Sequence, residues 1–209
     1  MAFTPIPIGS LNWGAPVNAA FTDHDTRITT LNRMQTSAAT DQNLIAWTWD
    51  PGTTITASTP TSGTVNMSKI WVREPATVNN VAMTIVTAPT ALTAGQNFAA
   101  LYDSTGARLG VTADQTANWA TVGLKDMPLT APAVIAAGAY YVAFVSNGTT
   151  PPAFGRGSSL AAGGQTVNIG LTATDARYTT GPVGQTTLPL SITMAARSID
   201  TRAWWAALK

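Results

Sequence analysis

Apolar and polar residues alternate along much of the chain after Leu44. The alternation is clearest in two stretches, Val65–Val72 and Val78–Val86. Successive side chains of a β-strand point to opposite faces, so this period of two predicts strands with one face buried. The chain after Leu44 is therefore expected to be built from strands, with turns rich in Gly, Pro and Thr between them.

Further strands follow the same reasoning. The sequence FAALYDSTGARLGVTAD predicts a hairpin that turns at residues 103–106, since Asp, Ser and Gly favour turns. Residues 139–148 form a strongly apolar strand that ends in an Asn-Gly turn. Residues 166–174 and 189–197 complete the set. About eight to ten short strands of this kind predict a mainly β fold, an antiparallel, jelly-roll-like β-sandwich.

The N-terminal region has a different periodicity. From Pro16, a favoured first residue of a helix, apolar side chains and the only histidine recur at spacings of four and three, which is the pattern of a coiled-coil seam. The seam residues are Val17, Phe21, His24, Ile28 and Leu31. Because a short amphipathic helix is marginal in isolation, the seam needs a partner. That partner is either the chain's own β-domain or, as the regular spacing favours, the same helix in sister chains.

Residues 1–14 contain prolines and glycines that predict an extended arm. The arm's apolar side chains either pack on the chain's own domain or dock on another protein. These residues are Ile6, Ile8, Leu11 and Trp13. The predicted organisation is an arm and oligomerisation helix over residues 1–40, followed by a β-sandwich domain over residues 41–209.

Composition excludes several classes of function. Charged residues make up only 10% of the 209 residues and the net charge is +1, without a basic cluster of the kind that nucleic acid requires. No cysteine is present, which rules out thiol catalysis and disulfides. No apolar run reaches the about 18 residues of a membrane span, and the first residues lack the pattern of a signal peptide. We expect no cofactor and no membrane insertion.

Candidate catalytic groups are sparse. His24 lies on the predicted seam, where it is expected to be a polar residue that specifies register, although three copies on a trimer axis could hold an ion or water. The carboxylates mostly stand beside turn signals, as Asp50, Asp103 and Asp126 do, and turn capping accounts for them. We therefore expect no catalytic residue, no metal site and no enzyme activity.

Aromatic residues offer the other route to function. Sugar-binding β-sandwiches use exposed aromatic rings with nearby polar groups, but most of the seven tryptophans are expected to pack in the core. Trp204 and Trp205, near the end of the chain, are expected to be buried against a strand or a subunit. Arg156 and Tyr178 are predicted to lie in loops and are the residues proposed here for ligand contact.

Two segments resemble the tail fibre and minor tail proteins of phages that infect actinobacteria. The first is IGSLNWGAPVNAAFTDHDTRITTL, in which an Asn-Trp-Gly element precedes a short helix with an Asp-x-Arg. The second runs from Phe98 to Gly148, where a LYDSTGARLGVTAD hairpin precedes PLTAPAVIAAGAYYVAF. The resemblance covers residues 8–31 and 98–148.

The resemblance implies a homotrimeric virion protein that is made in the host cytoplasm. Its N-terminal part would join other virion proteins, and its β-domain would face the host and adhere to a surface carbohydrate. The chain lacks the long shaft of a fibre, so a capsid decoration or head-fibre protein without a host ligand is the alternative. A polysaccharide hydrolase is a second alternative.

Overall fold

The computed structural model describes residues 19–27, 37–52, 55–157 and 166–209. The chain divides into two units between Gln42 and Asn43, beside the boundary expected from the sequence. In the first unit, residues 19–27 are helical, as predicted, and each of their side chains is exposed. A second helix, α2, spans Ser37–Asp41.

Several residues of the predicted interfaces lie outside the described part of the chain. They are the seam residues Val17, Ile28 and Leu31 and the arm residues Ile6, Ile8, Leu11 and Trp13. Phe21 and His24 are described, and both are exposed on the helix.

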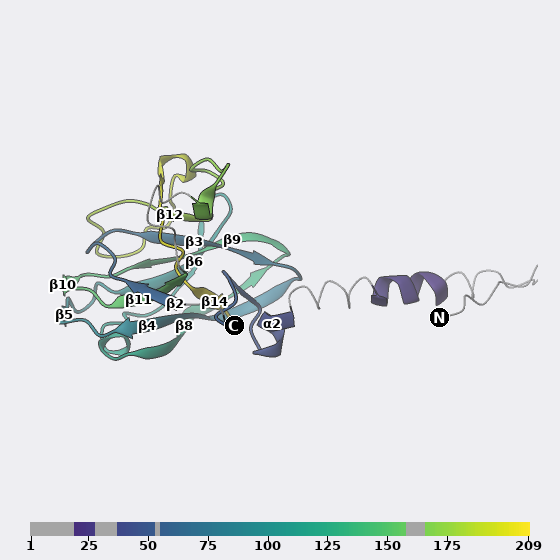
Figure 1. Cartoon of the computed structure of the whole chain (residues 1–209), viewed down its shortest axis with the longest axis horizontal. Coiled ribbons are helices and arrows are strands. Elements are labelled where there is room, and N and C mark those ends of the chain that lie inside the picture. The colour runs from purple at the N-terminus through teal and green to yellow at the C-terminus, as the bar shows by residue number, and fades with distance from the viewer. Residues whose placement is uncertain (1–18, 28–36, 53–54, 158–165) are drawn as a thin grey trace, which may run out of the picture. The chain divides into compact units, whose positions relative to one another are not determined.

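The second unit is an antiparallel β-sandwich (Figure 1). The first sheet has the order β1-β14-β4-β11-β2, and β8 pairs with the other edge of β4. Its strands are β1 (Ala46–Trp47), β14 (Ala206–Leu208), β4 (Ala76–Thr87), β11 (Ala153–Gly157), β2 (Ile55–Ser58) and β8 (Gly123–Ile135).

The second sheet has the order β13-β12-β3-β9-β6-β7, and β5 (Ala91–Leu92) pairs with β10 (Gly148–Thr150) in a separate ribbon. The strands of this second sheet are β13 (Ser198–Ile199), β12 (Tyr178–Thr180), β3 (Asn66–Val72), β9 (Gly138–Val145), β6 (Phe98–Asp103) and β7 (Arg108–Val111). The mainly β, antiparallel prediction is confirmed, whereas jelly-roll connectivity remains a prediction.

The main core lies between the two sheets. The alternating side chains of β4 and β8 meet those of β3, β6 and β9 there, as the period of two predicts. Phe144 and Phe154 contact each other with ring centroids 4.6 Å apart, and Trp204 stands edge-on to Phe144 at 5.3 Å. Burial of the C-terminal Trp204 and Trp205 against strands of their own domain confirms the prediction made for them.

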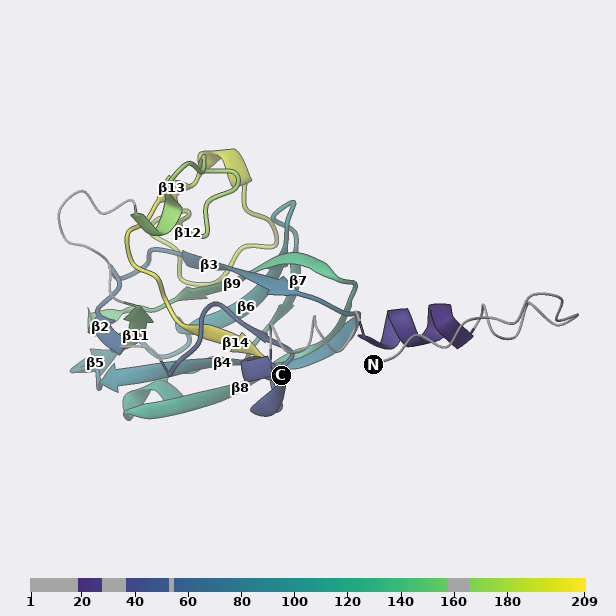
Figure 2. The ribbon, with the colours of Figure 1, turned by 45° about the vertical axis from the view of Figure 1, so that its right-hand side comes forward.

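A second apolar cluster covers part of the outer face of the second sheet. Leu188, Ile192 and Met194 pack there against Tyr102 and Tyr141. Figure 2 shows the segment that carries them, between β12 and β13, on the far side of β3 and β9 from the first sheet. This segment buries much of a sheet face that would otherwise be in water.

Two strand predictions are wrong, one for the stretch before β12 and one within the covering segment. Residues 166–174 form a 3₁₀ turn, Thr166–Asn168, followed by turns, and residues 189–197 contain another 3₁₀ turn, Met194–Ala196. Asn168 explains the first case, because its side-chain amide bonds to backbone groups that a strand would pair. In the second case the segment meets the sheet only at a single bridge, Ser191 with Ala107, and its apolar residues pack against the outer face.

Candidate functional site

Trp71 is the aromatic side chain best placed to meet a ligand. It lies in β3 between Ile70 and Val72, which point into the core between the sheets. Trp71 therefore points to the outer face of the second sheet, where 59% of it is exposed. Within the described residues no other tryptophan is exposed: Trp47 and Trp49 are half-buried, and Trp119, Trp204 and Trp205 are buried.

The neighbours of Trp71 leave its ring uncovered. Its partner across the antiparallel pair is Ala139 of β9, and Val72 pairs with Gly138. Directly opposed side chains in a sheet normally cover one another, but alanine and glycine are too small to cover an indole. β12 borders only the first half of β3, as its register ends with Tyr178 opposite Ser68. The indole is thus open on the outer face of the sheet.

Two cations flank Trp71 in the sequence. Lys69 lies two residues before it in β3, so its side chain emerges on the same side of the sheet. Arg73 lies two residues after it, just past the end of β3 at Val72. The Lys69 ammonium lies 5.9 Å from the centre of the Tyr141 ring and donates a hydrogen bond of 3.3 Å to the Asp175 carbonyl. Arg73 is exposed. Neither forms an ion pair with a carboxylate of the described residues.

The loop beside Lys69 borders this face. The Lys69 amide donates to the Arg177 carbonyl at 2.6 Å, which continues the pairing of β12 with β3 by one residue. The nearby Asp175 carboxylate accepts from the Thr172 hydroxyl at 3.4 Å, within its own loop. We call the set Trp71, Lys69 and Arg73 the Trp71 face. It combines a flat apolar ring with hydrogen-bond donors, the pairing found in sites that take a polar ring-shaped ligand.

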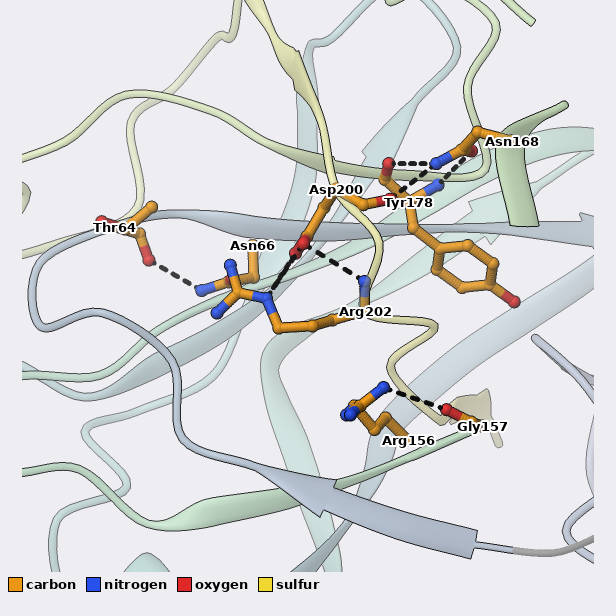
Figure 3. A network of polar contacts seen from close by, with 8 residues as sticks. All are labelled: Thr64, Asn66, Arg156, Gly157, Asn168, Tyr178, Asp200 and Arg202. Atoms are coloured by element: carbon orange, nitrogen blue, oxygen red, sulfur yellow. Dashed lines mark hydrogen bonds and ion pairs between the residues drawn. The ribbon is translucent and has the colours of Figure 1, made fainter. Parts of the chain in front are cut away.

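The residues proposed from sequence for ligand contact are placed differently. Tyr178 was expected in an exposed loop, but it lies in β12 and is 2% exposed. The Asn168 side chain holds the backbone of Tyr178: it accepts a hydrogen bond from the Tyr178 amide at 3.1 Å and donates one to the Tyr178 carbonyl at 2.9 Å (Figure 3). Burial raises the pKa of its hydroxyl, which Arg177 only partly offsets. The prediction for Tyr178 is wrong because β12 pairs with β3, which makes Tyr178 a buried strand residue opposite Ser68.

Arg156 was also expected in a loop, but it is part of β11 and half-buried. It pairs with Thr56 of β2 and forms a bridge with Trp204. Figure 3 shows its guanidinium beside Gly157, to whose carbonyl it donates at 3.4 Å. The loop assignment of Arg156 is wrong, and the structure does not bring it together with Tyr178 at an exposed site.

The same region contains a charged pair and two unpaired polar atoms. Arg202 pairs with Asp200 at 2.9 Å, and its guanidinium lies 5.2 Å from the centre of the Trp204 ring. The Asn66 amide donates to the Thr64 carbonyl, but its oxygen has no hydrogen-bond partner, and neither has the Trp204 indole nitrogen. Both atoms are buried among core side chains, so they are part of the interior of the sandwich.

The candidate carboxylates mainly organise turns. Asp50 accepts from the Gly52 amide at 2.7 Å, and Asp103 accepts from the Thr105 and Ala107 amides. Asp126 is the exception: it lies within β8, where it accepts from Asn80 at 2.5 Å and Lys209 at 2.7 Å. The turn assignment for Asp126 is therefore wrong, since its role is to link strand edges.

Neither a metal-binding cluster nor a membrane-spanning helix is found in the described part of the chain. No group of three or more His, Asp or Glu residues there is arranged to hold a metal ion. None of the described helices is both long and apolar enough to cross a membrane. Comparisons with protein-family models, curated proteins and solved structures found no match.

Proposed function

We propose that this chain is a non-enzymatic phage virion protein of the tail fibre or tail-tip type that forms a homotrimer and adheres to a host-surface glycan. The virion assignment rests on the sequence resemblance of residues 8–31 and 98–148. The adhesive role rests on the Trp71 face. Trimerisation rests on the spacing of the helix seam. It would present three weak glycan sites together, which raises the effective affinity without any new contact.

The exposure of Trp71 is the observation that carries the adhesive role. The indole is 59% exposed on the outer face of the second sheet, where the covering segment buries other aromatic side chains such as Tyr102 and Tyr141. The C–H face of a sugar ring can stack on the indole, while Lys69 and Arg73 donate hydrogen bonds to its oxygens. The proposed function is binding without turnover.

A glycan array with the full-length chain tests the adhesive role. We expect Trp71→Ala to weaken binding to the best array ligand by about 30-fold, the loss of one central aromatic contact of about 2 kcal/mol. Leu124→Ala is the matched control, because Leu124 is 65% exposed on the other sheet. Binding that Trp71→Ala leaves unchanged, or no glycan bound at all, would refute the proposal.

Electron microscopy of intact particles separates this role from capsid decoration. An antibody against the chain should label the tail tip. Labelling spread over the capsid would favour a decoration protein instead. Degradation of host-wall polysaccharide by the purified chain would favour the hydrolase alternative.

Sedimentation of the native chain tests the trimer. We expect Ile28→Asp to dissociate it, because a carboxylate in an apolar seam loses its hydration without gaining a partner. His24→Leu should leave the trimer intact or stabilise it, since leucine suits a seam position. A native chain that sediments as a monomer would contradict the seam.

A further inference from the structure

We propose that the glycan bound at the Trp71 face is acidic, so that a carboxylate or another anionic group of the sugar contacts Lys69 and Arg73. This inference rests on the proposed adhesive function and adds the chemical class of the ligand. The observation behind it is the pair of cations next to the indole in the sequence.

The two cations lie where a sugar on Trp71 would bring its substituents. Lys69 lies two residues before Trp71 on β3, about 7 Å along the strand, and Arg73 follows Val72, the last residue of β3. A sugar ring that stacks on Trp71 would therefore lie close to Lys69, on the same face, and to Arg73, at the end of the strand. A carboxyl group on such a ring can form charge-assisted hydrogen bonds with them, which are stronger than bonds to a neutral hydroxyl.

Neither cation is paired with a carboxylate of the described residues. Lys69 contacts a carbonyl and an aromatic ring, and the Asp175 carboxylate accepts a hydrogen bond from Thr172. In the described residues the ion pairs are formed by Arg202 with Asp200 and by Lys209 with Asp126, away from the Trp71 face. A neutral glycan would leave two cations over a bound sugar without compensation, whereas an acidic one would complement them.

The test uses an array that carries each uronate-containing oligosaccharide beside its carboxyl-reduced counterpart. We expect the full-length protein to bind the acidic member at least about tenfold more tightly, as one hydrogen bond between charged groups provides. The preference should shrink as salt is raised from about 0.05 M to about 0.5 M, because exposed charges are screened.

Variants assign the preference to the two cations. Lys69→Gln and Arg73→Gln should each reduce the acidic-to-neutral ratio severalfold while binding of the reduced oligosaccharide persists. Lys209→Gln removes the same charge from the first sheet, beside Asp126, and should leave the ratio unchanged.

The outcomes separate this inference from the proposed function. Equal binding of both array members, or tighter binding of the neutral ones, with loss in Trp71→Ala would overturn the acidic ligand and keep the adhesive role. An acidic preference that survives in Lys69→Gln and Arg73→Gln would also overturn it. Binding that is absent, or indifferent to Trp71, would refute the proposed function itself.

Discussion

Replacement of Trp204 by alanine should destabilise the sandwich more than most single substitutions. Trp204 is fully buried and stands edge-on to Phe144 and Phe154, at centroid distances of 5.3 and 6.4 Å. A buried tryptophan removes about 200 Å² from water, which at about 25 cal/mol per Å² is about 5 kcal/mol. Alanine retains a small part of this burial energy, and the Trp204 indole nitrogen has no hydrogen bond to lose. We therefore expect a loss of about 4 kcal/mol.

The same substitution at Trp71 is the matched control. Its exposed ring buries little area, so Trp71→Ala should cost less than about 1 kcal/mol. Guanidinium unfolding followed by far-ultraviolet circular dichroism, at one fixed chain concentration, gives both values. For a domain of this size, a loss of about 4 kcal/mol lowers Tm by roughly 8–16 °C. Equal effects of the two substitutions would refute the placement of Trp204 in the core.

Three further predictions concern stability. Arg197 is 4% exposed, lies 4.4 Å from the Tyr141 ring and donates hydrogen bonds to the Ala173 and Thr174 carbonyls. Arg197→Met should lower the free energy of unfolding by about 3 kcal/mol, because it leaves these acceptors unpaired. A loss below about 1 kcal/mol in urea unfolding would contradict this. Gly106 has φ +92°, and a Cβ there would collide with the Ile192 carbonyl, whereas Gly95 has φ +75° and open space around it. Gly106→Ala should therefore lower Tm more than Gly95→Ala does. Equal shifts of Tm would show that the clash is relieved. Burial opposes the charged forms of Asp103, Asp114 and Asp126, but hydrogen bonds outweigh it and hold each pKa below its ordinary value. Because each pKa is lower in the folded state, these carboxylates stabilise the fold fully above about pH 4, and their contribution is lost as the pH falls through the folded pKa values. A Tm that does not change between about pH 5 and pH 2.5 would contradict this.

The regular strands could be predicted because their pattern follows from burial on one face. β3 and β4 lie where the alternation of apolar and polar residues placed them, and the hairpin of β6 and β7 turns at Asp103, as its composition indicated. The covering segment could not be predicted this way. Ile192 and Met194 are spaced like residues of a strand, but the segment pairs with the sheet backbone at a single bridge, Ser191 with Ala107, before the 3₁₀ turn at Met194. Its apolar side chains pack on the outside of the sheet, which imposes the same spacing as a strand.

The candidate site was only partly accessible from sequence. Trp71 lies between Ile70 and Val72, two apolar strand residues that point into the core. Because side chains alternate along a strand, the indole is expected to point away from the core. What the sequence does not reveal is the partner strand, and it is Ala139 opposite Trp71 that leaves the ring open. Tyr178 shows the reverse error, because its burial depends on the pairing of β12 with β3, which is distant in sequence.

The most direct test of the adhesive role is the indole N–H signal of Trp71 in a ¹H–¹⁵N spectrum of the full-length chain. The chain has seven tryptophans, and the signal missing from Trp71→Ala identifies this residue. On titration with the best array glycan, the Trp71 signal should shift in proportion to the bound fraction, while the buried Trp119 and Trp205 signals stay in place. A glycan that binds while the Trp71 signal remains unmoved would contradict the proposed site.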